Sequence, residues 1–159
     1  MPTSGVFIWG NRSGDGKEAM DALALAARIL FVMIFLSSGL MGHLGPGRSM
    51  LTQFAAARKI PSPGFLVAFS GVWIIVGSVS VLLGIYGDVG ALMLALFVTA
   101  TALFMHPYWK ESDEQAKMME QVQFSKDLGL AGGALGLFVV FAALGPELGL
   151  TITESLFEL

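Results

Sequence analysis

The residues best suited to chemistry gather where one apolar stretch ends and the next begins. His106 precedes Pro107 and is followed closely by Trp109, while Lys126 and Asp127 open the next apolar stretch. Proline lacks an amide hydrogen and disfavours helix in the residue before it, so a helix should end near His106. A quinone site at a membrane edge needs a hydrogen-bond donor, an acceptor and an aromatic wall. The histidine, the tryptophan, the lysine and the aspartate therefore form a candidate site for a quinone head or an anionic substrate.

A haem is the second possibility that the histidines raise. His43 and His106 are the only two histidines, and a four-helix topology puts both at one end of the bundle. A bis-histidine haem bridging two helices needs that common level. Yet both imidazoles lie at helix ends, where each can hydrogen-bond to water, to lipid or to a helix-end carbonyl. We therefore disfavour haem and expect no intrinsic cofactor or metal; the plainer interpretation makes Lys126 and Asp127 a charge-balanced helix start.

Other classes of site are excluded by composition and pattern. The chain has no cysteine, and hence no thiolate nucleophile, iron–sulfur ligand or disulfide. It has no phosphate-binding loop, zinc spacing or dinucleotide fingerprint, and no credible serine–histidine–acid triad. The basic residues are scattered and the net charge is −3, so we expect no nucleic-acid partner. The sequence thus predicts no catalytic residue.

The elements that must position the candidate residues are membrane-spanning helices. Of 159 residues, 55% are hydrophobic and 13% charged, with a mean hydropathy of +0.73; soluble domains carry about 25% charged residues. A spanning helix needs about 20 apolar residues. Four stretches qualify, at about 22–41, 65–85, 89–105 and 124–144. We predict an all-α fold, a bundle of four transmembrane helices within residues 22–145, in contact with the lipid bilayer.

The remaining segments are predicted to flank this bundle or to lie on its surface. Residues 1–21 form a polar and aromatic tail, and residues 146–159 an acidic C-terminal tail. Short interfacial helices are predicted in the two longer loops, one over 49–57 and one after Ser112, whose spacing to Gln115 fits a capping box.

Charge sets the expected orientation. The loops after the first and third spans carry most of the basic residues, which are Arg48, Arg58, Lys59, Lys110 and Lys117. The positive-inside rule then makes these loops cytoplasmic and both termini external, in a bacterial inner membrane. Arg28 lies near the start of the first span, and we expect it to snorkel to the headgroups, with a cation facing the bundle as the alternative.

Glycines provide positions for close helix packing. The second span carries Gly71 and Gly77, and the fourth span has two overlapping GxxxG patterns, formed by Gly129, Gly132, Gly133 and Gly136. Small residues let the backbones of neighbouring helices approach each other closely. The pattern does not identify a specific partner. We expect contacts with other membrane subunits, and a homo-oligomer is also open.

The order of these features resembles the DoxX family of small four-helix membrane proteins. The similarity covers about residues 25–146, and its most specific parts are the end of the third span, 106–109, and the start of the fourth, 124–128. Family members usually carry a glutamate where Trp73 stands, and many carry a lysine where this chain has Gly42 and His43. The missing acid weakens any transfer of catalytic activity.

The resemblance implies a membrane redox context, because the family is named for a subunit of a thiosulfate:quinone or terminal quinol oxidoreductase. Three hypotheses follow from it. The preferred one is a non-catalytic accessory subunit of a larger membrane redox or electron-transfer complex. The second is the quinone-facing membrane subunit of an oxidoreductase, and the third a stand-alone scaffold that docks soluble redox partners.

Overall fold

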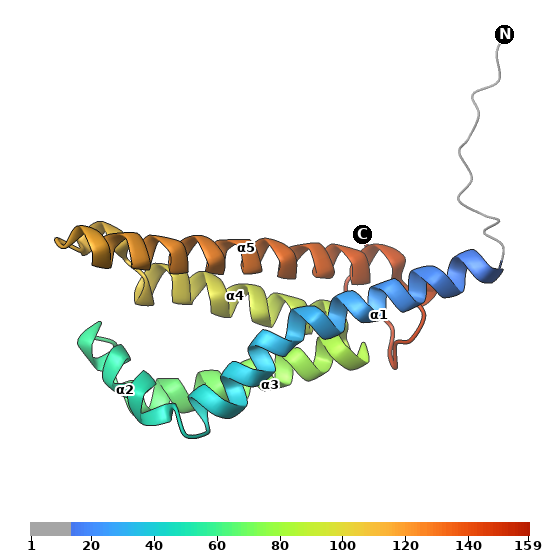
Figure 1. Ribbon diagram of the computed structural model, residues 1–159. Helices are drawn as coiled ribbons and strands as arrows, with labels where there is room; N and C mark the ends of the chain where they lie inside the picture. The colour runs from blue at the N-terminus through green and yellow to red at the C-terminus, as the bar shows by residue number, and fades with distance from the viewer. Residues whose placement is uncertain (1–13) are drawn as a thin grey trace, which may run out of the picture.

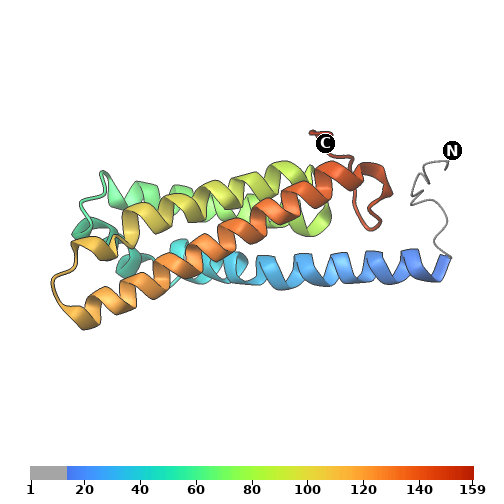
Figure 2. The same cartoon turned by 90° about the horizontal axis from the view of Figure 1, so that it is seen from above.

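The computed structural model describes residues 14–159. Within this range four helices are long and apolar enough to cross a membrane. They are α1 (Gly14–Ser37), which continues as a π-helical turn over Ser38–His43, α3 (Pro63–Leu83), α4 (Gly87–Met105) and α5 (Glu114–Leu144). They run along one another (Figures 1 and 2), with α1 packed on α3, α3 on α4, and α4 on α5. The predicted all-α four-helix bundle is confirmed.

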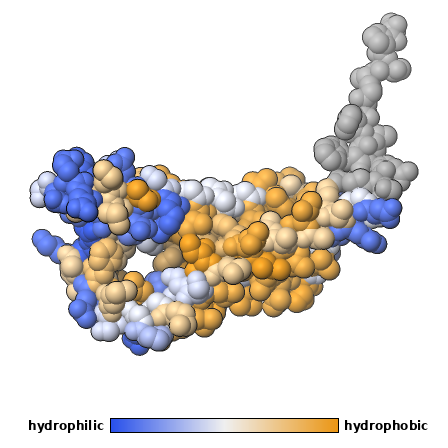
Figure 3. All heavy atoms as spheres, viewed as in Figure 1, coloured by the Kyte–Doolittle hydropathy of each residue, from blue (hydrophilic) through white to orange (hydrophobic). Residues whose placement is uncertain are grey.

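The middle of the molecule is an apolar belt. Large apolar side chains such as Leu30, Phe65 and Leu96 are exposed on it, and Figure 3 shows this orange surface between two more hydrophilic ends. Apolar area of this extent in a chain with four spanning helices is covered by lipid. The protein is therefore an integral membrane protein.

The loop between α1 and α3 contains α2 (Arg48–Ala57), in agreement with the helix expected over 49–57. The second loop differs from the prediction. It contains only a short 3₁₀ turn, Tyr108–Lys110, because the expected surface helix and the fourth span form one continuous helix, α5. The N-cap of α5 is Asp113, whose Oδ1 accepts a hydrogen bond from the Ala116 amide at 2.8 Å. The predicted capping box beginning at Ser112 was therefore wrong.

Because α5 is continuous, two of the candidate site residues lie inside a helix and not at its start. No proline interrupts 114–144, and a change from polar to apolar composition does not by itself break a helix. Lys126 and Asp127 therefore lie more than three turns inside α5, and they do not start a helix. α1 likewise begins earlier than expected, at Gly14, so part of the predicted N-terminal tail is helical. The aromatic patch at 6–9 lies outside the described residues.

Glycine lets the helices approach closely where α3 packs. A Cβ added at Gly71 would lie 2.6 Å from Cβ of His43, and one added at Gly77 would lie 3.2 Å from the Gly90 carbonyl oxygen. On α5 a Cβ added at Gly133 would lie 3.1 Å from the Phe31 ring. The other three glycines of the pattern have nothing within 4 Å among the described residues, namely Gly129, Gly132 and Gly136. They form an open face.

The C-terminal segment packs on the bundle and is not a free tail. Arg28 is 1% exposed, which corrects the snorkelling prediction, and its Nη1 donates to the Leu150 carbonyl at 3.0 Å. Asp88 of α4 is 0% exposed, and its Oδ2 accepts from the amides of Leu156 and Phe157, both at 2.7 Å. Figure 1 shows this red segment folded against the end of the bundle. Buried charges are costly unless hydrogen-bonded. The segment supplies partners to both side chains, and Arg28 Nη2 and Asp88 Oδ1 are left without one among the described residues.

We predict that Asp88→Ala destabilises the bundle. The carboxylate accepts two part-buried hydrogen bonds, each contributing about 1.5–3 kcal/mol when one partner is charged, so Tm in detergent should fall by about 6–24 °C. Glu154→Ala, an exposed change in the C-terminal segment that Asp88 binds, is the control and should leave Tm within about 1 °C of wild type. An unchanged Tm for Asp88→Ala would refute the anchoring role.

Candidate functional site

A pocket of about 480 Å³ opens at the end of the bundle that carries α2. All five helices contribute to it, and its wall is mainly apolar, including Phe35, Phe54 and Phe97. Figure 3 shows the molecule hollowed near this end. The pocket is also lined by the polar residues His43, His106, Lys126 and Asp127. Three of the four residues that the sequence predicts for a quinone or anion site therefore meet in one cavity, together with the second histidine.

The fourth predicted residue lies elsewhere. Trp109 is 51% exposed and is not part of the pocket lining. Its ring packs edge-on against Tyr108 and Phe124, with centroid distances of 5.2 and 5.7 Å. An exposed aromatic cluster between α4 and α5 fits the predicted interface belt better than a ligand wall. The aromatic wall of the pocket comes instead from phenylalanines on α1, α2, α3 and α4.

One wall of the pocket is built around His43, at the end of the π-helical turn. Its Nδ1 lies 3.1 Å from the Val67 carbonyl oxygen and 2.9 Å from Oγ of Ser70. Because a carbonyl only accepts, Nδ1 is the protonated nitrogen of the ring. The ring is held against α3 by this bond and meets Phe97 of α4 at 5.8 Å. Its Nε2 is left for the pocket side.

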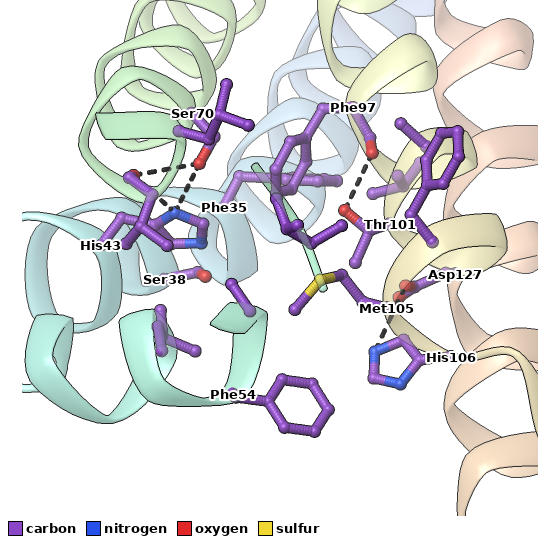
Figure 4. A pocket seen from close by; sticks show the side chains of 18 of the residues that line it. Phe35, Ser38, His43, Phe54, Ser70, Phe97, Thr101, Met105, His106 and Asp127 are labelled. Carbon is purple, nitrogen blue, oxygen red and sulfur yellow. Dashed lines mark hydrogen bonds and ion pairs between the residues drawn. The ribbon is translucent and has the colours of Figure 1, made fainter. Parts of the chain in front are cut away.

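The opposite wall is built around His106 (Figure 4). Pro107 ends α4 at Met105, and the chain then returns through α5, which carries Glu120 and Asp127. These two acids are seven residues apart, so they share one face of the helix. Nδ1 of His106 lies 2.8 Å from Glu120 Oε2, and its Nε2 lies 3.9 Å from Asp127 Oδ2. The helix spacing thus fixes the imidazole between two carboxylates.

An ion-pair network closes the outer edge of this wall. Arg58, just beyond α2, contacts Glu111 Oε1 at 2.6 Å through Nη1 and Glu120 Oε1 at 2.8 Å through Nη2. It therefore ties the α1–α3 loop to α5 above His106. Sequence analysis missed Glu111 and Glu120 as site residues and used Arg58 only for orientation. The spacing of Glu120 to Asp127 on one helix face was the available signal.

Asp127 is the least satisfied group of the wall. Its side chain is 5% exposed. Oδ1 lies 3.3 Å from Nζ of Lys126, which is itself 45% exposed and donates to Gln123 at 2.7 Å. Oδ2 is buried and has no hydrogen-bond partner. Such an atom at a pocket wall calls for a donor, which water or a ligand can supply.

The two imidazoles stand on opposite walls of the cavity (Figure 4). Among residues 14–159 there is no group of three or more histidine, cysteine, aspartate or glutamate side chains that could hold a metal ion. The cavity suits a small, mostly apolar molecule with polar groups at its edge.

Trp73 has a structural role. Its Nε1 donates a hydrogen bond of 2.8 Å to the Met93 carbonyl, which joins α3 to α4. The indole is not among the pocket residues. Trp73, which stands where the family resemblance led us to expect a glutamate, therefore contributes no acid to this site.

Comparison with known proteins agrees with the fold. No curated protein and no solved structure matches the chain. The model of the DoxX family matches residues 23–107, more than half of the chain, from α1 to the turn after α4. The match includes both histidines and leaves out Lys126 and Asp127. On this match the protein belongs to the DoxX family.

Proposed function

We propose that this DoxX-family membrane protein binds a small ring compound of the quinone class as part of a membrane redox system. The observation that carries the proposal is the apolar pocket with an imidazole on each of two opposite walls. Quinone heads are flat and apolar and carry two polar oxygens, and sites for them lie near the membrane edge. The pocket offers an aromatic lining for the ring and polar groups for the oxygens.

Access from the lipid supports a ligand of this kind. Phe69 and Phe104 line the pocket and are also exposed on the apolar surface of the bundle, Phe104 at 63%. A hydrophobic ligand dissolved in the bilayer reaches such an opening without crossing water. The polar end of the pocket lies beside the charged residues of α2 and α5, so the head and the tail of an amphipathic molecule both find a suitable environment.

A free anion is a poorer fit to the same pocket. Each cation of the polar wall is already paired: Arg58 with Glu111 and Glu120, and Lys126 with Asp127. Three carboxylates thus meet two cations there. An added anion would face this excess of negative charge at low dielectric, where like charges repel strongly. The quinone alternative is therefore favoured over an anionic substrate.

We predict that Ser38→Trp blocks the pocket. Ser38 lines the cavity next to Phe35, so a large ring there occupies the ligand space, and affinity should fall at least tenfold, about 1.4 kcal/mol. The measurement is calorimetric titration of the protein in nanodiscs with tetramethyl-p-benzoquinone and, separately, its hydroquinone, against empty nanodiscs.

Ser37→Trp is the matched control, because Ser37 is adjacent, exposed and absent from the pocket lining. It should bind both compounds as wild type does. If wild-type protein binds neither form above the lipid background, the proposed function is wrong.

A second candidate function is an accessory subunit of a larger membrane complex, and a specific observation favours it. The open glycine face of α5, formed by Gly129, Gly132 and Gly136, has no neighbour within 4 Å among the described residues. Exposed small residues on a spanning helix permit close approach of another helix. A partner subunit, or a second copy of the chain, would pack there.

We predict that Gly132→Leu and Gly136→Leu each remove a helix partner without unfolding the monomer, since an added Cβ has no neighbour within 4 Å among residues 14–159. Co-purification from the source membrane in mild detergent should lose the partner band. Val76→Leu, exposed on α3 and away from the glycine face, is the control and should keep it. An unchanged set of co-purifying proteins in the glycine variants would reject this face as the contact.

We further propose that the pocket end faces the cytoplasm, on the strength of the basic residues in its two loops. The chain has no native cysteine, so single cysteines report topology directly. Lys110→Cys should be protected from a membrane-impermeant maleimide in intact cells, whereas Glu154→Cys should be labelled. The reverse labelling pattern would show the opposite orientation.

A further inference from the structure

The polar groups that face the pocket are mostly hydrogen-bond acceptors. We infer that the pocket selects the reduced, dihydroxy form of its ring ligand over the oxidised, dicarbonyl form. This inference rests on the proposed function and names the form of the compound that the site takes. It follows from which atoms of His43 and Asp127 are already bonded and which are left.

Asp127 provides an acceptor on one wall. The Asp127 Oδ2 is buried and unpartnered, and its distance of 3.9 Å to Nε2 of His106 is too long for a hydrogen bond. The Glu120 carboxylate only accepts, so Nδ1 of His106 donates in the His106–Glu120 bond. A ligand hydroxyl at this wall would give Asp127 Oδ2 the donor that it lacks.

His43 provides an acceptor on the other wall. Its Nδ1 donates to the Val67 carbonyl, so Nε2 of the neutral ring is the acceptor left over. Figure 4 shows His43 with Ser70 on one side of the cavity and His106 with Asp127 on the other. A ring with hydroxyl groups at its two ends can donate toward each wall.

The donors near the pocket are largely occupied. The guanidinium of Arg58 and the ammonium of Lys126 are paired with carboxylates, and the Thr101 hydroxyl donates to the Phe97 carbonyl at 2.9 Å. Ser38 is the lining hydroxyl for which the structure shows no such bond. An oxidised ring can accept from Ser38 and from the remaining N–H of Lys126, but it leaves Asp127 Oδ2 unsatisfied. A reduced ring satisfies that carboxylate, which is a charged acceptor and hence forms the stronger bond.

The test compares the two redox forms of one compound. Tetramethyl-p-benzohydroquinone, kept reduced under anaerobic conditions, and tetramethyl-p-benzoquinone are each titrated into wild-type protein in nanodiscs. We expect the hydroquinone to bind at least tenfold more tightly, which corresponds to one hydrogen bond to a charged group. Equal affinities, or tighter binding of the quinone, would overturn the inference while leaving the proposed function intact. Binding of neither form would reject the proposed function itself.

The variant Asp127→Asn tests whether this carboxylate causes the preference for the hydroquinone. The amide keeps the shape of the side chain but presents an N–H donor, so the preference for the hydroquinone should fall about tenfold or reverse. Asp113→Asn, at the exposed cap of the same helix, should retain the wild-type ratio. A ratio unchanged in Asp127→Asn would show that this carboxylate does not select the ligand. The wild-type ratio needs no variant and decides the main point even if Asp127→Asn fails to fold.

Discussion

The pocket depends on one carboxylate, that of Glu120. One of its oxygens binds Arg58 beyond α2, and the other binds His106 at the end of α4. Three segments that are distant in sequence are therefore joined at a single side chain of α5. Two charges held close together at low dielectric attract strongly, but only if both remain bonded. This pairing holds α2 across the mouth of the cavity and sets the orientation of the His106 ring.

At the other end of the bundle, charged side chains are also held by bonds to a distant segment, but their partners are backbone groups. Arg28, Asp21 and Asp88 are bonded to backbone groups of the C-terminal segment. In the hydrocarbon region no water is present to satisfy such groups, so the protein must supply the partners itself. Backbone contacts fill this end, although Arg28 Nη2 and Asp88 Oδ1 have no hydrogen-bond partner among the described residues. At the other end the unpartnered Asp127 Oδ2 lies at the wall of a cavity, which puts the candidate ligand site beside α2.

A gap in helix packing explains where the cavity lies. The helices pack in chain order, from α1 through α3 and α4 to α5, and the π-helical turn at Ser38–His43 swings the chain toward α2. Extra residues per turn, as in a π-helix, often occur at functional sites. Here the turn brings His43 against α3, where Gly71 leaves room for its Cβ. A larger residue at 71 would push this wall into the cavity.

The sequence by itself determined the membrane class, the four helices, the helix end at His106–Pro107 and the meeting of His43, His106, Lys126 and Asp127 near one level. These features follow from local rules: apolar length, proline geometry and the alternation of spans. Only the tertiary structure decided that Trp109 lies outside the pocket, that Arg28 is buried, and that Glu120 joins α2 to His106. The bonding of a polar side chain depends on which distant segment reaches it, and that information is absent from local composition and spacing.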